Sequence, residues 1–287
     1  MRILVIGGAG FIGSAVVSYI QSKEHAVDIM DLKRPQEGWL PMDIRDKTLL
    51  TTDLSSYDII MIFAAVTSQL EFQKNPEDSF STNATGLSNV LEACKRSKVK
   101  KVLFASSAAV YGNSRKRMSE EDPYKPNNMY AASKVIGEYL VNAYIQKGYF
   151  DGVILRYFNT YGIGENAKGD YKSIISIFLE DIRTKGEVLV YGDGEQRRDF
   201  INVKDVARIT FELAMKHTGT FNVGTGESFQ WNTILDYLQG QGLKFRRKYI
   251  QNPIRDYQYF TEANIDKLKS VGLQAEMNIR KGIDELL

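Results

Sequence analysis

The sequence of 287 residues contains little of what metal centres and nucleophilic triads need. It has one cysteine, Cys94, and two histidines, His25 and His217, in unrelated contexts. One cysteine excludes an internal disulfide framework and indicates a reducing compartment, so we expect a cytoplasmic protein with Cys94 as a small core residue of a helix. Two isolated histidines argue against a histidine-based metal site and a Ser-His-Asp triad, and we expect no metal.

The sequence also lacks a strong excess of either charge and a long apolar run. Its 37 basic and 35 acidic residues are mixed along the chain and give a formal net charge of +2. This balance argues against a dedicated nucleic-acid or membrane-surface protein. No apolar run approaches the roughly 18 residues of a membrane-spanning helix. The start MRILVIGGAG does not have the pattern of a signal peptide. We therefore expect neither a nucleic-acid nor a membrane partner.

The first half of the chain alternates apolar strand patterns with helical patterns. The segments RILVIG, AVDIMDL, DIIMIFAA, KKVLFASS and DGVILRYF are typical of strands, and FIGSAVVSYIQSK and NATGLSNVLEACKRS of the helices between them. This alternation predicts an α/β protein with a Rossmann-type, doubly wound parallel sheet that helices cover on both faces.

The pattern changes near residue 160. SIISIFLEDIRTKG and VKDVARITFELAMKH are typical of helices, and EVLVYGDGEQRRDFINV is typical of a hairpin with GDG at its turn. We therefore predict a dinucleotide-binding domain at 1–158 and a smaller C-terminal α/β lobe at 159–287, with segments near 199–226 returning to the cleft.

A glycine-rich turn follows the first predicted strand. In IGGAGFIGS, Gly7, Gly10 and Gly13 let the backbone approach a pyrophosphate at the start of a helix. Asp31 ends the second strand, where a carboxylate accepts ribose hydroxyls and repels a 2′-phosphate, which favours NAD over NADP. Lys33 and Arg34 weaken that preference, and a simple turn role is the alternative for Asp31.

The segment MYAASKVIGEYL sets Tyr130 four residues ahead of Lys134, on one face of a predicted helix. By itself this spacing favours an amphipathic helix with a partly buried tyrosine and a lysine whose stem is covered. Upstream, FASSAAVYG predicts a strand that runs into Ser106 and Ser107 at the edge of the sheet where ligands bind. Together these segments supply a Ser/Tyr/Lys set.

At this point the chain resembles a known family along nearly its whole length. GGAGFIGS, DIRD, SSAAVYG, YAASK, LRYFNTYG, YGDGEQRRDFINVKDVA and FNVGTGE match, in order, the motifs of extended short-chain dehydrogenases/reductases of the NAD-dependent nucleotide-sugar epimerase/dehydratase group, in particular UDP-glucose 4-epimerase-like proteins. The resemblance implies NAD as cofactor and a nucleoside-diphosphate sugar as substrate.

The resemblance also implies catalytic roles. Tyr130 corresponds to the general base, Lys134 to its partner, and Ser107 to the residue that holds and polarises the substrate oxygen. A free tyrosine has a pKa of about 10, and nearby positive charge favours its phenolate. Lys134 and the nicotinamide ring would supply that charge, so that Tyr130 takes a proton from a sugar hydroxyl while hydride leaves the same carbon.

Cofactor contacts follow from the same motifs. Asp43 and Ile44 correspond to residues at the adenine, and Ala64 and Ala65 to the segment beneath the ribose, although Ile62 replaces a histidine that many relatives have. For Asn83, an ordinary N-cap is the alternative. The full predicted set is Gly7, Gly10, Phe11, Ile12, Gly13, Asp31, Asp43, Ile44, Ala64, Ala65, Asn83, Ser106, Tyr130 and Lys134.

Substrate contacts are implied in the C-terminal part. Asn159 and Arg198 correspond to residues that bind the diphosphate, and Tyr191 to the segment that lines the base. Arg255 is a second candidate for binding the diphosphate, although NPIRDYQYF departs from the family's usual R-x-G-D motif. For Arg197 we expect a solvated charge. Ser107 completes the predicted substrate set.

The resemblance narrows the reaction. Ala108 and Ala109 stand where dehydratases carry an Asp-Glu pair, and the glutamate of uronate decarboxylases is missing from the same stretch. A 4-epimerase remains, which oxidises C4, lets the ketone rotate and returns the hydride to the other face. The alternatives are a 4-keto-sugar reductase, an NDP-heptose-type epimerase, favoured by YQYFTEANIDKLKSVGL, and a catalytically silent NAD-sensing protein.

The family pairs through the helix that bears the catalytic tyrosine and the helix before it. Here these are YAASKVIGEYLVNAYIQ and GLSNVLEACKRS, and each has enough apolar positions for a second face. We therefore expect a homodimer.

Overall fold

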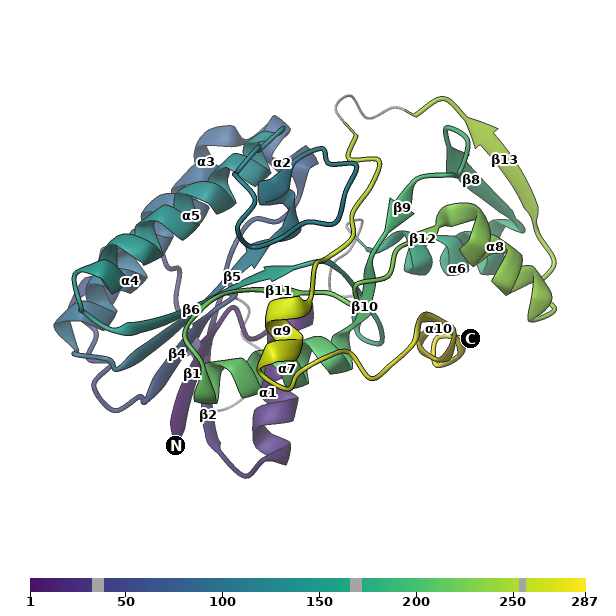
Figure 1. Cartoon of the computed structure of the whole chain (residues 1–287). Coiled ribbons are helices and arrows are strands. Elements are labelled where there is room, and N and C mark those ends of the chain that lie inside the picture. Colours follow the sequence, from purple (N-terminus) through teal and green to yellow (C-terminus); the bar gives the residue numbers. More distant parts are fainter. Residues whose placement is uncertain (33–38, 166–171, 253–256) are drawn as a thin grey trace. The chain divides into compact units, whose positions relative to one another are not determined.

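The computed structural model describes residues 1–32, 39–165, 172–252 and 257–287. The chain packs into two compact units, whose elements are labelled in Figure 1. The first unit comprises 1–112, 124–156 and 207–221, and the second comprises 113–123, 157–206 and 222–287. The division into domains at 1–158 and 159–287 stays a prediction. None of the helices in these described ranges is long and apolar enough to cross a membrane.

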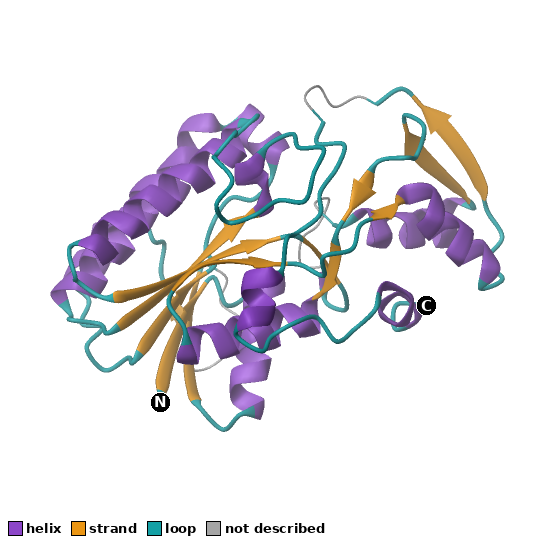
Figure 2. Ribbon diagram, viewed as in Figure 1, coloured by secondary structure: helices purple, strands orange, loops and turns teal. Residues whose placement is uncertain are grey.

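The first unit is built on a seven-stranded sheet with the order β11-β6-β5-β4-β1-β2-β3 (Figure 2). Its strands are β1 (Arg2–Ile6), β2 (Ala26–Asp31), β3 (Trp39–Pro41), β4 (Ile59–Ile62), β5 (Lys101–Ser107), β6 (Asp151–Tyr157) and β11 (Gly219–Val223). All pairings from β3 to β5 are parallel. The strand order reverses between β1 and β4, which is where doubly wound sheets bind ligands at the carboxyl ends of their strands. The predicted fold class is confirmed.

Helices cover both faces of this sheet, so its central strands are apolar throughout. In β1 and β4 the side chains from Ile3 to Ile6 and from Ile59 to Ile62 are at most 1% exposed. Figure 1 shows α4 and α5 side by side on one face and α1 and α7 on the other. Tyr19 and Phe211 join the latter two, with their ring centroids 5.6 Å apart. The helices are α1 (Phe11–Ser22), α2 (Gln69–Lys74), α3 (Pro76–Phe80), α4 (Leu87–Arg96), α5 (Met129–Gln146) and α7 (Val203–Lys216), with short η1 (Lys47–Thr51), η2 (Ser81–Gly86) and η3 (Ala108–Tyr111).

The second unit combines three two-stranded ladders with four helices in its described part. β7 (Asn159–Tyr161) pairs with β10 (Phe200–Asn202), β9 (Arg197–Arg198) with β12 (Phe229–Gln230), and β8 (Glu187–Tyr191) with β13 (Arg246–Ile250). The helices are α6 (Ile174–Lys185), α8 (Trp231–Gly240), α9 (Asp266–Ser270) and α10 (Ile279–Asp284). An aromatic and aliphatic core that includes Phe178, Trp231 and Leu235 holds α6 and α8 together.

The predicted hairpin over 187–203 is wrong. The chain does turn at GDG, where Gly192 and Gly194 have φ values of +65° and +76°. The two arms do not pair with each other, however, because β8 pairs in parallel with β13 and β9 pairs antiparallel with β12. Turn chemistry is local and was visible in the sequence, whereas these partners come from later in the chain. Within 199–226, residues 207–221 pack in the first unit and the remainder in the second.

Candidate active site

The glycine turn between β1 and α1 leaves no room for side chains. Gly7 has a φ of +85°, and a Cβ there would lie 2.4 Å from the backbone nitrogen of Ala64. A Cβ on Gly13 would lie 2.2 Å from the carbonyl oxygen of Gly7. The turn therefore packs directly on the segment after β4, and Gly10 caps α1 without a side chain. A helix start of this kind presents backbone N–H groups to an anion such as a pyrophosphate.

Beside this turn lies a cavity of about 320 Å³. Its lining includes Gly7, Gly10, Asp31, Asp43, Ile44, Ala64 and Ala65, so seven of the predicted cofactor residues are brought together. Phe11, Ile12 and Gly13 form the first turn of α1 and are not part of this lining. The residues that line the cavity fit the adenosine half of a dinucleotide.

The charges in this cavity favour a cofactor without a 2′-phosphate. Its described charged residues are Asp31, Asp43, Asp78 and Arg45. Arg45 bonds to both Asp43, at 2.6 Å, and Asp78, and it holds the pKa of the Asp43 carboxyl below its usual range. Three carboxylates against one guanidinium give the cavity an excess of negative charge, to which Asp31 contributes. Lys33 and Arg34, which the sequence placed nearby, lie outside the described residues.

Asp31 also holds the glycine turn. Its carboxylate accepts a hydrogen bond of 2.9 Å from the Ala9 backbone N–H. The residue ends β2, as the sequence predicted, and its role is more than that of a strand-ending turn residue.

The predicted catalytic residues come together at the end of β5 and the start of α5. Asn128 caps α5 by accepting a hydrogen bond from the Ala131 N–H at 2.8 Å, which fixes the first turn that carries Tyr130. The Tyr130 hydroxyl lies near the Ser107 side chain, which lowers the pKa of the phenol. Lys134 is 4% exposed, and its Nζ donates to the Ala105 carbonyl oxygen at 2.8 Å. All three side chains therefore converge on the carboxyl end of one strand.

In this structure the surroundings of the catalytic set do not favour the phenolate form of Tyr130 that base catalysis needs. Burial raises the pKa of Tyr130, and the nearby Ser107 side chain lowers it in part. Burial lowers the pKa of Lys134 to about 8, and the carboxylate of Glu138 opposes that shift. The phenol is thus neutral at neutral pH, and further positive charge beside Tyr130 would be needed to favour the phenolate.

Asn83 is not an N-cap. The helix expected to start there begins earlier, with Pro76 in the first turn of α3, and continues through the π-helix η2 into α4. Asn83 is 5% exposed and bonds both the N–H and the carbonyl oxygen of Val66, at 2.8 and 2.9 Å. It also donates to the Ser133 hydroxyl on α5 at 2.9 Å. Since Val66 lines the cavity, Asn83 links the cavity wall to the helix that bears Tyr130.

In the second unit, Arg198 lies on β9 and Asn159 on β7, where Asn159 pairs with Phe200 of β10, two residues after Arg198. Arg198 is 8% exposed, donates to the Arg197 carbonyl oxygen at 2.8 Å, and lies over the Tyr257 ring at 4.8 Å. Burial lowers the pKa of its guanidinium. No carboxylate within the described ranges forms an ion pair with it. Asn159 donates to the Thr261 hydroxyl at 3.0 Å.

Two other substrate predictions have different outcomes. Tyr191 ends β8, where its ring lies 6.1 Å from that of Trp231. Arg255 lies outside the described residues. Arg197, expected to be a solvated charge, is exposed but donates to both the hydroxyl and the carbonyl oxygen of Ser228, at 3.0 and 2.8 Å.

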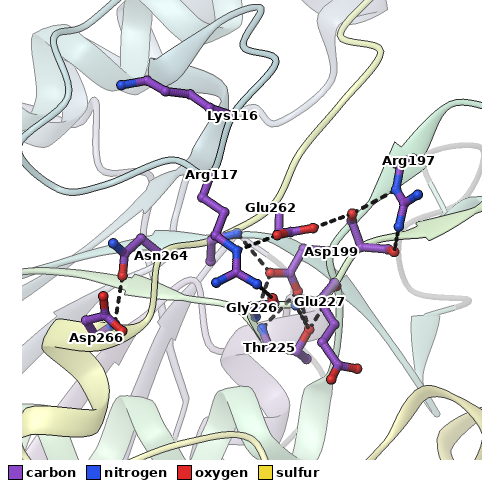
Figure 3. A network of polar contacts seen from close by, with 12 residues as sticks. Lys116, Arg117, Arg197, Asp199, Thr225, Gly226, Glu227, Glu262, Asn264 and Asp266 are labelled. Carbon is purple, nitrogen blue, oxygen red and sulfur yellow. Dashed lines mark hydrogen bonds and ion pairs between the residues drawn. The ribbon is translucent and has the colours of Figure 1, made fainter.

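A buried carboxylate, Asp199, organises the backbone around these residues (Figure 3). It is fully buried and accepts hydrogen bonds from the Thr225 N–H and hydroxyl, the Gly226 N–H and the Ala263 N–H, at 2.6 to 3.0 Å. Its own carbonyl oxygen accepts from the Asn159 N–H at 3.1 Å. Burial raises the pKa of Asp199 to about 6, and these hydrogen bonds oppose the rise.

The sequence analysis did not identify four features of the site. These are Arg45, the hydrogen-bond partners of Asn83, the buried Asp199, and Glu138 on α5. A signal existed for Glu138, which stands four residues after Lys134 and therefore on the same helix face. For Asp199 there was none, because its partners come from segments far along the chain.

Named proteins are similar to this chain over nearly its whole length. The model of the NAD dependent epimerase/dehydratase family matches residues 3–224. A putative UDP-glucose 4-epimerase from Methanocaldococcus jannaschii is 31% identical over 99% of this chain and 97% of its own. An ADP-L-glycero-D-manno-heptose-6-epimerase from Nitratidesulfovibrio vulgaris is 32% identical over 94% of this chain and 91% of its own. The structure of the Thermus thermophilus UDP-glucose 4-epimerase in complex with NAD is 29% identical, covers 99% of this chain and 98% of its own, and has a TM-score of 0.88.

The sheet order and the glycine turn define a dinucleotide-binding α/β protein. The chain belongs to the NAD dependent epimerase/dehydratase family. The family and NAD as the family's cofactor are thus confirmed, and the family is one of NAD-dependent epimerases and dehydratases, whose members among these relatives are named for more than one reaction.

Proposed function

We propose that the protein is an NAD-dependent nucleotide-sugar 4-epimerase with Tyr130 as the base. The observation that carries this proposal is that the Tyr130 and Ser107 side chains lie near each other at the end of β5, the strand whose Ala105 carbonyl oxygen accepts from the buried Lys134 ammonium. A phenol, a hydroxyl and an ammonium so arranged can hold a substrate hydroxyl and exchange its proton. Relatives named UDP-glucose 4-epimerase support the choice of reaction.

The side chains have distinct roles in this proposal. Ser107 holds the oxygen on C4 of the sugar, and Tyr130 accepts the proton of that hydroxyl as the carbon is oxidised. NAD, when bound, supplies a reversible acceptor for the hydride. After the 4-keto sugar has rotated, Tyr130 returns the proton to the oxygen on C4, and hydride is added to the opposite face of that carbon. Lys134 keeps positive charge near the phenolate during both half-reactions.

The residues assigned to the cofactor and those assigned to the nucleoside diphosphate belong to different units. We assign the cofactor to the first unit, with the glycine turn at the pyrophosphate, Asp31 at the ribose, and Asp43 and Ile44 at the adenine. We assign the nucleoside diphosphate to the second, with Arg198 and Asn159 at the phosphates and Tyr191 at the base.

The exposed aliphatic and aromatic side chains Ile136 and Tyr139 on α5 support a homodimer. The single thiol, Cys94, is buried, which agrees with a cytoplasmic location.

Two alternatives have specific support. An NDP-heptose-type epimerase is supported by the 32% identical heptose epimerase relative and by the YQYF motif. A 4-keto-sugar reductase shares the Ser107, Tyr130 and Lys134 set. Dehydration is less well supported, because η3 places Ala108 and Ala109 directly after Ser107 and neither side chain can transfer a proton.

One experiment separates these functions. The purified protein is denatured, any released dinucleotide is identified, and UDP-, dTDP-, GDP- and ADP-sugars are then supplied to the native protein. Formation of the C4 epimer with NAD recovered unchanged supports the proposal. A heptose epimer, or net reduction of a 4-keto sugar, supports one of the alternatives. Bound NAD with no turnover of any sugar nucleotide would show a catalytically silent binding protein.

A further inference from the structure

The first unit contains a buried ion pair that the proposed mechanism does not use. Glu138 on α5 is 0% exposed and Arg156 on β6 is 3% exposed. The guanidinium bonds to both carboxylate oxygens, with Nε 2.9 Å from Oε1 and Nη2 2.8 Å from Oε2. A buried pair of this kind is expensive to desolvate and often adds nothing to stability over apolar side chains of the same volume. Its presence therefore calls for a reason other than stability.

Three further side chains complete the cluster. The Ser106 hydroxyl donates to Glu138 Oε1 at 2.5 Å, and the Tyr124 hydroxyl donates to Oε2 at 2.8 Å. Arg156 Nη1 donates to the Tyr111 hydroxyl at 2.8 Å. The rings of Tyr111 and Tyr124 lie 4.9 and 5.1 Å from the guanidinium carbon. The Glu138 carboxylate is thus saturated with donors from β5, β6 and the segment that leads into α5.

The cluster adjoins the catalytic set at two points. Ser106 immediately precedes Ser107 on β5, so its bond to Glu138 fixes the end of that strand against α5. Glu138 also follows Lys134 by one helical turn and Tyr130 by two. The preceding residue of β5, Ala105, accepts from the Lys134 ammonium. Successive residues of one strand end are therefore bonded to successive turns of one helix.

Glu138 supplies the negative charge near Lys134. Lys134 bonds to the Ala105 carbonyl oxygen and lies over the Phe104 ring, both from β5. On α5, Tyr130 stands one turn before it and Glu138 one turn after it. Arg156 from β6 bonds to Glu138 and to Tyr111 from η3. Glu138 is the carboxylate among them, and it opposes the loss of the lysine proton that burial favours. Arg156 in turn keeps Glu138 in place.

We propose that Glu138 is a positioning residue of the reaction: held by Arg156, its carboxylate fixes the end of β5 against α5 and places a negative charge one helical turn from Lys134. The inference rests on the proposed function, since it assigns Lys134 the role given there. It differs from a purely structural account, in which the pair would only join two elements and Lys134 would titrate independently of it.

The test uses Glu138→Gln, with Asp205→Asn as a matched control. Asp205 is 4% exposed and accepts from the Glu276 and Met277 N–H groups in the second unit, so its replacement also removes a buried, hydrogen-bonded carboxylate. Lys134 is titrated by NMR in protein labelled with ¹³C-lysine, and its signal is assigned from its loss in Lys134→Met. The pH dependence of kcat and of KM is measured on the same preparations.

In Glu138→Gln we expect the Lys134 titration to move to lower pH by about one pH unit, because loss of an opposite charge disfavours the ammonium. The alkaline limb of kcat should move with it, kcat should fall about tenfold or more, and KM should change little. Asp205→Asn should lower the melting temperature and leave the Lys134 titration and the pH dependence of kcat unchanged. An unmoved Lys134 titration in Glu138→Gln overturns the proposal, even if the variant is less stable and less active.

Failure of the proposed function would look different. If Tyr130→Phe kept its turnover, the mechanism would be wrong, whereas the NMR shift of Lys134 in Glu138→Gln would remain and would support the electrostatic link by itself. The double variant Glu138→Gln/Arg156→Met removes the uncompensated guanidinium. Recovery of stability together with full recovery of kcat and of the wild-type pH profile would reduce the pair to a structural role and overturn the inference.

Discussion

The Lys134 ammonium donates a 2.8 Å hydrogen bond to the carbonyl oxygen of Ala105, two residues before Ser107 on the same strand. This bond anchors the lysine to the strand end that carries the catalytic serine. It also means that Lys134 can act on Tyr130 through its charge and does not need to contact the phenol.

Tyr130→Phe is expected to abolish turnover while NAD stays bound, because the substitution removes only the ionisable oxygen near Ser107. Turnover of a sugar nucleotide and the dinucleotide content of the purified protein are measured together. Tyr149→Phe, at an exposed tyrosine three residues beyond the end of α5, serves as the control and should behave as the wild type. Activity of Tyr130→Phe within about tenfold of the wild type would remove Tyr130 as the base.

Lys134→Met is expected to weaken both base function and NAD binding, and it has a signature in stability. Burial lowers the pKa of Lys134 to about 8, below the value of about 10.4 in an unfolded chain. Between these two pH values the unfolded state binds more protons, so the free energy of unfolding of the wild type should rise with pH there. In Lys134→Met that rise should be smaller. Urea titrations of the apoprotein between about pH 7.5 and 10.5 measure the difference, and parallel slopes would contradict it.

Arg198→Ala is expected to raise the KM for the sugar nucleotide and to leave NAD content unchanged. Loss of charged hydrogen bonds to a diphosphate costs about 2 to 5 kcal/mol, which corresponds to a KM raised about 30-fold or more. The structural alternative, a carboxylate partner for Arg198, has no support in the described residues, where the guanidinium contacts Arg197 and Tyr257. Arg197→Ala is the control. An unchanged KM with a lowered melting temperature would take Arg198 out of the substrate site.

Asp31→Ser is expected to weaken the preference for NAD over NADP, because it removes the carboxylate at the end of β2 and part of the cavity's excess of negative charge. Dissociation constants for both dinucleotides are measured by fluorescence titration. The ratio of the NADP dissociation constant to the NAD dissociation constant should fall by about tenfold or more from its wild-type value. Asp28→Ser, on the same strand and paired with Arg2, is the control. A wild-type ratio in Asp31→Ser would show that other groups select the cofactor.

Asp199 should give the protein an unusual pH dependence of stability. Its folded pKa of about 6 lies above the value of about 3.9 in an unfolded chain. The folded state therefore binds more protons between these values, and this residue's contribution to stability should fall as pH rises from about 4 to 6. In Asp199→Asn the contribution should disappear, and the variant should be less stable because an amide group would face backbone N–H donors. Melting temperatures of both proteins across this range test the prediction; equal pH slopes would contradict it.

Features that depend on residues close in sequence could be predicted. The glycine turn, the strand that ends at Asp31 and the one-turn spacing of Tyr130 and Lys134 all follow from local patterns. Strands buried on both faces also identify themselves by continuous apolar residues, which is why the doubly wound sheet could be foreseen.

Only the tertiary structure decided which distant segments bond to one another. The hairpin prediction failed because hydrogen bonding of β8 and β9 is satisfied by strands from later in the chain. The N-cap alternative for Asn83 failed because the helix extends back to Pro76. The sequence shows Asp199 as an ordinary acidic residue, and for Glu138 it shows only a place one turn after Lys134. Their burial, and with it their importance, comes from donors supplied by other segments, because a carboxylate can be kept out of water only where the fold brings such donors to it.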